Sequence, residues 1–200
     1  MSFLFRQGIG QNCDILQIAL VDLAGKIKPW SRYLQPSREI DPGASRVNRL
    51  TLVNDKLCYN GIACKNVVPQ EAGINIFFEH ISKYYPDGVT LVAHNGFRFD
   101  FPLIKRDLRK YRFDEKLGDQ YQIKGLDSLE VFRKQFPRLS KHNQPYLVEQ
   151  FLGPEKSLEA HEAIGDCVNL KCIIETAAKE KGLTVMEFLG LSNNRTFRIL

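Results

Sequence analysis

The sequence contains few cysteines, and their arrangement argues against two kinds of scaffold. The chain has five, an odd number, and no two of them form a C-x-x-C pair. Neither a disulfide framework nor a zinc cluster is therefore indicated. We expect the protein to work in a reducing compartment.

Long apolar runs, internal repeats and low-complexity segments are also missing. The first residues, MSFLFRQG, turn polar too early for a signal peptide, and no apolar run is long enough to span a bilayer. We expect no membrane contact and a cytoplasmic or nuclear location.

What the chain does contain is typical of one globular domain. It has 200 residues, of which 44% are hydrophobic and 26% charged, enough for one sizeable core. The net charge of +5 is a modest bias toward anionic partners such as nucleic acid. The charge alone does not identify a partner.

Hydrophobic periodicity predicts strands at the start of the chain and alternating helices and strands after them. Gly and Pro residues punctuate these segments. The expected strands lie at 2–6, 14–21, 27–34, 89–93 and 125–129. The expected helices lie at 44–49, 71–85, 101–111, 146–152 and 162–181, with a short apolar turn at 185–191.

The segment His161-Glu-Ala-Ile-Gly-Asp166 enters the last long helix. On a helix of 3.6 residues per turn, Asp166 shares a stripe with Ala163 and Leu170, so its carboxylate is expected to be aimed at the core. A buried carboxylate needs a metal ion or hydrogen-bond donors. A structural, hydrogen-bonded Asp remains the alternative, and His161 is either a polar loop residue or a group beside a metal-bound water.

A second segment, LVAHNGFRFD, predicts a buried strand that breaks at Asn95-Gly96 and continues into a helix. Asp100 is then expected near the helix N-terminus, at a strand-to-helix edge where ligands often bind. Alternatively, Asp100 complements the helix dipole, which is worth up to about 1 kcal/mol. Asn95 is likewise open to interpretation as an ordinary turn residue.

The pattern H-N-x-x-F-D followed by H-x-A-x-x-D resembles the second and third motifs of the DEDDh exonucleases, which belong to the DnaQ-like superfamily. The resemblance covers nearly the whole chain. It implies an α/β, RNase H-like fold in which helices flank a mixed, largely five-stranded sheet. We expect this domain to span 1–182, followed by a short helix and tail at 183–200.

The resemblance also implies a reaction, metal-dependent 3′ to 5′ hydrolysis of phosphodiester bonds at single-stranded 3′ ends of DNA or RNA. Family members use two Mg²⁺ or Mn²⁺ ions. Carried over, Asp100 and Asp166 are metal ligands and His161 is the general base. His94 and Asn95 are assigned to nucleic-acid contacts.

The family's first motif, D-x-E on the first strand, is absent from this chain. Phe3 and Phe5 stand at the two acidic positions, and we expect their rings to project toward the cleft. Gly8 and Ile9 still match the residues that line the 3′-terminal nucleotide. With two of four acids missing, we expect one metal ion or none and impaired activity.

Two alternatives to an impaired exonuclease stay open. One is a catalytically inactive module that binds nucleic acid, and the other is a protein-interaction module on the same fold. The missing motif is explained either by true loss or by an alternative start of the chain.

Asp14 is not expected to substitute for the lost acids, and Asp127 is interpreted as structural. The basic cluster at 105–112 contacts phosphates or is a solvated helix face.

Overall fold

A seven-stranded mixed sheet forms the centre of the computed structural model, which describes residues 2–7, 13–113, 115, 121–159, 162–190 and 197–199. The strand order is β10-β9-β8-β1-β2-β3-β7. The five central strands have five to seven residues each, whereas the two edge strands have two, which confirms the expected largely five-stranded sheet. The strands are Ser2–Gln7 (β1), Ile15–Val21 (β2), Trp30–Gln35 (β3), Val68–Pro69 (β7), Val89–Ala93 (β8), Ile123–Asp127 (β9) and Phe197–Arg198 (β10).

The directions of the strands bring the ends of three of them to one edge. β1 runs antiparallel to β2, and β2 runs antiparallel to β3. β1, β8 and β9 are parallel to one another, with Ala93 directly beside Asp127 where β8 and β9 end. The turn that follows β8 and the helix that follows β9 therefore start side by side.

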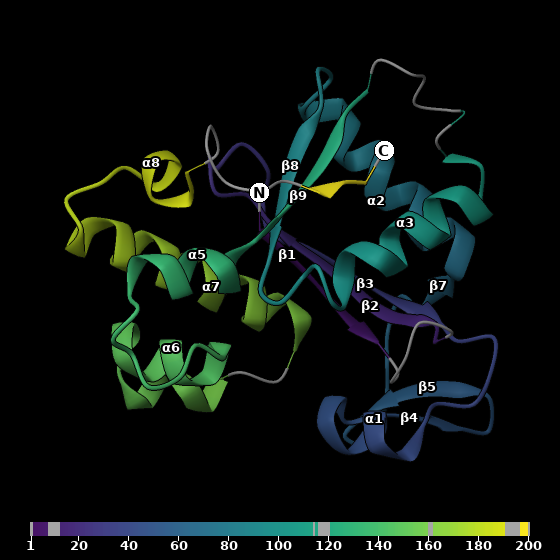
Figure 1. Ribbon diagram of the computed structural model, residues 1–200. Coiled ribbons are helices and arrows are strands. Elements are labelled where there is room, and N and C mark those ends of the chain that lie inside the picture. The colour runs from purple at the N-terminus through teal and green to yellow at the C-terminus, as the bar shows by residue number, and fades with distance from the viewer. Residues whose placement is uncertain are drawn as a thin grey trace.

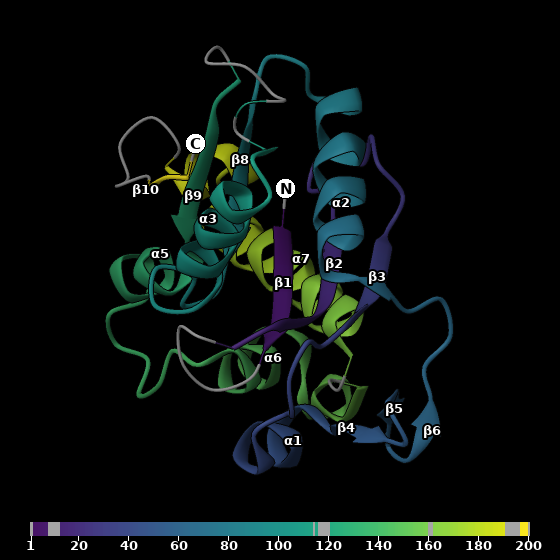
Figure 2. The same ribbon diagram turned by 90° about the vertical axis from the view of Figure 1, so that its right-hand side faces the viewer.

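Helices cover both faces of the sheet, which is why β2 is buried along its whole length. α2 and α3 share one core cluster with Leu91 of β8, and α5, α6, α7 and α8 share a second cluster with Val92. Figures 1 and 2 show these two layers. The helices are Gln70–Tyr84 (α2), Asp100–Lys110 (α3), Ser128–Gln135 (α5), Gln144–Leu152 (α6), Ala163–Glu180 (α7) and Val185–Leu189 (α8), with a 3-10 helix at Pro154–Glu159 (η1).

An accessory module follows β3 and precedes β7 in the chain, and it lies at the bottom of the views in Figures 1 and 2. Leu50 and Leu57 of this module pack on Leu16 of β2. The sequence predicted its helix but not its sheet, although Asn60-Gly61 is a strong hairpin signal and both residues have positive φ, 50° and 78°. The module consists of Pro42–Asn48 (α1), Leu50–Val53 (β4), Lys56–Tyr59 (β5) and Ile62–Ala63 (β6).

The C-terminal segment packs against the rest of the domain. Phe188 and Leu189 of α8 are buried in the second core cluster. β10 pairs with β9, and Ile199 is buried in the first cluster. Within the described residues, no helix combines the length and apolarity that crossing a membrane requires.

Candidate active site

The second motif forms the turn between β8 and α3. Asn95 adopts a left-handed conformation with φ of 62°, and its carbonyl accepts the N–H groups of Arg98 and Phe99. A Cβ on Gly96 would lie 2.7 Å from the ring of Phe101, so only glycine allows this close approach. The break predicted at Asn95-Gly96 is confirmed.

Asp127 at the end of β9 holds this turn in place. Its Oδ1 accepts the backbone N–H of Asn95 at 2.8 Å, and its Oδ2 accepts that of Phe97 at 3.1 Å. Oδ1 also accepts the N–H of Leu129 at 2.9 Å and thereby caps α5. The interpretation of Asp127 as structural is confirmed.

His94 has protein partners at both ring nitrogens. Nε2 lies 2.7 Å from the carbonyl oxygen of His142, and Nδ1 lies 3.0 Å from Oγ of Ser128. Burial lowers the pKa of His94, and the hydrogen bond to the His142 carbonyl offsets this only in part. His94 is therefore neutral at pH 7. Its predicted contact with nucleic acid would have to be made without displacing these two bonds.

Asp100 lies in the first turn of α3 and is buried, with 4% of its surface exposed. The positive end of the helix dipole favours a carboxylate at this position. Exposed Phe99 precedes it, and the guanidinium of Arg98 lies 5.2 Å from the Phe99 ring. The turn thus carries a buried acid beside an exposed aromatic ring and a cation.

Asp166 lies in the first turn of α7, and the structure corrects one expectation about it. The predicted stripe is real, because Ala163, Leu170 and Ile173 are fully buried. Asp166 itself is only partly buried, so its carboxylate is not enclosed in the core. A helical wheel predicts which side of the helix a residue lies on. It does not predict whether the neighbouring elements extend far enough along the helix to cover that residue.

Two glutamines hold the first turn of α7. The N-cap residue Glu162 makes no side-chain capping bond. Instead, Oε1 of buried Gln17 on β2 accepts the N–H of Ala163 at 3.2 Å. Nε2 of Gln144 on α6 donates to the carbonyl oxygen of Asp166 at 2.7 Å. Sequence patterns gave no signal for either residue, because both contacts join distant segments.

The strand expected at the missing first motif is present as β1. Phe3 pairs with Leu20 of β2, and Phe5 pairs with Ile18. The direction of the two rings stays a prediction. Gly8, Ile9 and His161 lie outside the described residues.

Asp14 has structural partners of its own. Its Oδ2 accepts the N–H of Ser37 at 2.6 Å and the Ser37 hydroxyl at 2.8 Å. Nε of Arg38 lies 3.9 Å from Oδ1. These contacts give Asp14 a role in joining β2 to the loop after β3.

Comparison with known proteins identifies the family. A family model described as Exonuclease matches residues 8–173. The chain belongs to this exonuclease family. The match starts directly after β1, the strand on which the first motif was expected. A comparison with curated protein sequences gave no match.

Solved structures of exonucleases share the fold. Exonuclease X in complex with 5′ overhanging duplex DNA aligns with a TM-score of 0.54 at 17% identity, covering 96% of this chain and 98% of that one. A zinc-bound complex of E. coli exonuclease I with single-stranded DNA gives 0.69 at 14% identity, with 95% and 42% coverage. Exonuclease I from Methylocaldum szegediense gives 0.65 at 12% identity, with 95% and 41% coverage. The chain thus spans about two fifths of the length of exonuclease I and nearly all of exonuclease X, and these likenesses establish an RNase H-like exonuclease fold.

The number and type of acidic side chains determine how many metal ions this exonuclease domain can hold. No group of three or more His, Cys, Asp or Glu side chains suited to a metal occurs among the residues that the structure describes. Carboxylates are nevertheless the right donor type for Mg²⁺ or Mn²⁺. Mg²⁺ is often held by one or two protein carboxylates, with water and substrate phosphates completing its coordination. The carboxylates of Asp100 and Asp166 are therefore of the donor type that such an ion takes.

Three of the five cations at 105–112 are used within the protein. Nε of Arg106 lies 2.6 Å from Oδ1 of buried Asp107, and its Nη1 donates to the carbonyl of Cys13. Lys105 donates to the carbonyl of Arg198, and Arg112 pairs with Glu115. These contacts weaken the prediction that the cations at 105–112 bind the phosphates of a nucleic acid.

A second group of cations was missed by the sequence reasoning. It lies at the end of α5 and in the loop before α6, and every member is exposed. No ion pair or hydrogen bond engages these side chains, all of which lie in the described segment 121–159. The group consists of Arg133, Lys134, Arg138 and Lys141.

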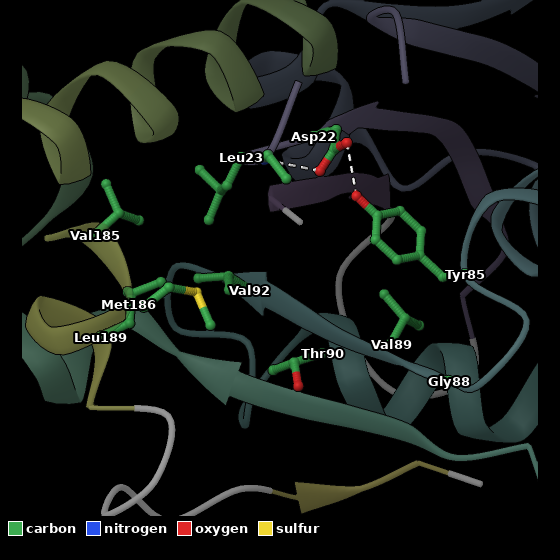
Figure 3. Close-up of a pocket in the computed structure, with 11 residues that line it drawn as sticks. Asp22, Leu23, Tyr85, Gly88, Val89, Thr90, Val92, Val185, Met186 and Leu189 are labelled. Atoms are coloured by element: carbon green, nitrogen blue, oxygen red, sulfur yellow. Dashed lines mark hydrogen bonds between the residues drawn. The ribbon is translucent and has the colours of Figure 1, made fainter. Parts of the chain in front are cut away.

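A separate cavity of about 330 Å³ lies between the end of β2, the start of β8 and α8 (Figure 3). Val92 and Met186 contribute to its mainly apolar wall. Its one acid, Asp22, accepts the hydroxyl of Tyr85 at 2.7 Å and three backbone N–H groups. Burial alone would raise the pKa of Asp22, but these hydrogen bonds outweigh it and lower the pKa. None of the predicted site residues that the structure describes lines this cavity.

Proposed function

We propose that the chain is a 3′ to 5′ exonuclease domain of the DEDDh type whose activity is impaired by the loss of its first motif. One observation carries the proposal. The segments that bear Asp100 and Asp166 are both tied to the same three residues, His142–Gln144, through His94 and Gln144. This connection supports a shared site at the edge of the sheet where β8 and β9 end.

In this proposal, Asp100 and Asp166 hold one Mg²⁺ or Mn²⁺ ion. The bound ion would stabilise the charge that develops on the phosphate oxygens during hydrolysis. His161 takes the proton from the attacking water. Gly8 and Ile9 line the 3′-terminal nucleotide, as in the family, and Asn95 and His94 shape the turn beneath it.

The proposed substrate is a single-stranded 3′ end of DNA or RNA. Exposed aromatic rings bind single strands by stacking on bases, and Lys and Arg bind the phosphates. Phe99 with Arg98 supplies such a ring and cation next to Asp100. The uncompensated cations at 133–141 add positive charge near His142, where the loop contacts the second motif.

The proposal predicts slow shortening of a 5′-labelled single-stranded oligonucleotide from its 3′ end in Mn²⁺. Asp166→Asn should abolish this activity, because it removes the ligand charge and keeps the side-chain shape. The matched control is Asp87→Asn, an exposed acid in the turn before β8. Product ladders on denaturing gels measure the rate for DNA and RNA substrates.

A second candidate function is a nucleic-acid-binding module without catalysis. The observation that favours it is the absence of a three-donor metal group among the described residues. The same assay separates the two functions. If the native chain binds the oligonucleotide but shortens it no faster than Asp166→Asn does, the module is the correct assignment.

A further inference from the structure

The segment His142–Gln144 contacts both motif segments within three consecutive residues. At one end, the carbonyl oxygen of His142 lies 2.7 Å from Nε2 of His94 in the second motif. At the other end, Nε2 of Gln144 donates to the carbonyl oxygen of Asp166 in the third motif at 2.7 Å. Only Asn143 stands between them. The segment is therefore a short bridge between the turn that follows β8 and the first turn of α7.

The bridge is itself fixed in place. Nε2 of the His142 ring lies 3.0 Å from the carbonyl oxygen of Phe136 and closes the loop that precedes the bridge. Oδ1 of Asn143 accepts the N–H of Tyr146 at 3.2 Å and caps α6. The position of Gln144 at the start of α6 is thus determined by the loop and by the helix.

Gln144 contacts α7 at Asp166, which is one of the two proposed metal ligands. Gln17 holds the start of the first turn through the N–H of Ala163, and Gln144 holds the end of the same turn through the carbonyl oxygen of Asp166. Asp100 and Asp166 lie on different helices, so a shift of α7 along the sheet would change the separation of their carboxylates. Sites of this kind tolerate misplacements of only about 0.5 Å.

We propose that Gln144 is a positioning residue that sets the place of Asp166 relative to the second motif. This inference rests on the proposed function, because it requires a cation shared by Asp100 and Asp166. Gln144 acts on the backbone of Asp166 and touches neither the cation nor the substrate. Its amide donor is the required group, since the acceptor on Asp166 is a carbonyl oxygen.

Two substitutions remove the donor in different ways. Gln144→Glu keeps the shape and adds a negative charge, and Gln144→Leu keeps the approximate size without a charge. An added carboxylate near a cation would by itself tighten binding, so weaker binding in Gln144→Glu reports a change of geometry. Gln150→Glu, at an exposed position on the same helix, is the matched control for charge.

The experiment measures Mn²⁺ affinity by electron paramagnetic resonance, together with the melting temperature of each chain. Both Gln144 variants should bind Mn²⁺ about tenfold more weakly, the lower end of the effect of outer-shell changes. Their melting temperatures should fall by only about 2 to 4 °C, as expected for one lost hydrogen bond in a domain of this size. Gln150→Glu should match the native chain in both measurements.

Three results would overturn the inference, and they differ in whether they also contradict the proposed cation site. Native Mn²⁺ affinity in both Gln144 variants would remove the positioning role and leave the cation site intact. An equal loss in Gln150→Glu would show that the loss does not depend on the contact between Gln144 and Asp166. No Mn²⁺ binding by the native chain would overturn the cation site and the inference together.

Discussion

Phe3→Asp combined with Phe5→Glu should raise the rate of 3′-end shortening by about 10² to 10⁴-fold over the native chain. The two changes recreate the family's D-x-E spacing on β1, which the structure places between β2 and β8. A second cation site would then form beside Asp100. The several kcal/mol that a metal contributes to the transition state correspond to this range of rates.

The rate of a single-turnover reaction in Mg²⁺ or Mn²⁺ measures this gain. Adding His161→Ala should remove most of it, because general-base catalysis contributes about 10² to 10⁴-fold. Phe3→Asp combined with Phe5→Gln is the matched control, since it restores the first acid and places an uncharged polar side chain at the second acidic position. Equal rates in the native chain and in the Asp-Glu variant would show that Phe3 and Phe5 do not occupy the lost positions.

Asp127→Ala should lower the free energy of unfolding by about 3 to 5 kcal/mol. Three backbone N–H groups, those of Asn95, Phe97 and Leu129, would lose their carboxylate acceptor. Hydrogen bonds to charged groups contribute about 1.5 to 3 kcal/mol each, and part of this is recovered by rearrangement. Urea unfolding followed by circular dichroism measures the change.

Asp127→Asn serves as the comparison for this prediction. It retains one acceptor oxygen, which can still serve Asn95 and Leu129, and should cost about half as much as the Ala variant. If Asp127→Ala costs less than about 1 kcal/mol, other contacts hold the turn of the second motif, and the structural role assigned to the Asp127 carboxylate is wrong.

The central fold could be predicted from the sequence where apolar runs are bounded by strong turn signals. β8 was predicted at 89–93 and is observed there, because Gly88 and Asn95-Gly96 delimit it. α5 was missed because no break separates it from β9, and Asp127 both ends the strand and caps the helix. The accessory sheet was missed because its short strands carry few buried residues.

The candidate site could be predicted only in part. The motifs placed Asp100 and Asp166 on the correct elements, at the starts of α3 and α7. The roles of Gln17 and Gln144 could not be predicted, since contacts between segments far apart in the chain depend on tertiary packing. The cations at 105–112 were left open as phosphate contacts or a solvated helix face, because the sequence does not show that Asp107 pairs with Arg106 and Glu115 with Arg112.

The central claim is that Asp100 and Asp166 form one divalent-cation site, and Mn²⁺ titration of four chains tests it most directly. The native chain and Asp87→Asn should bind one Mn²⁺ ion weakly, with equal affinity. Asp100→Asn and Asp166→Asn should each lose this binding, because both carboxylates hold the same ion and neither suffices alone. Unchanged Mn²⁺ binding in either of these two variants, or no binding by the native chain, would contradict the claim.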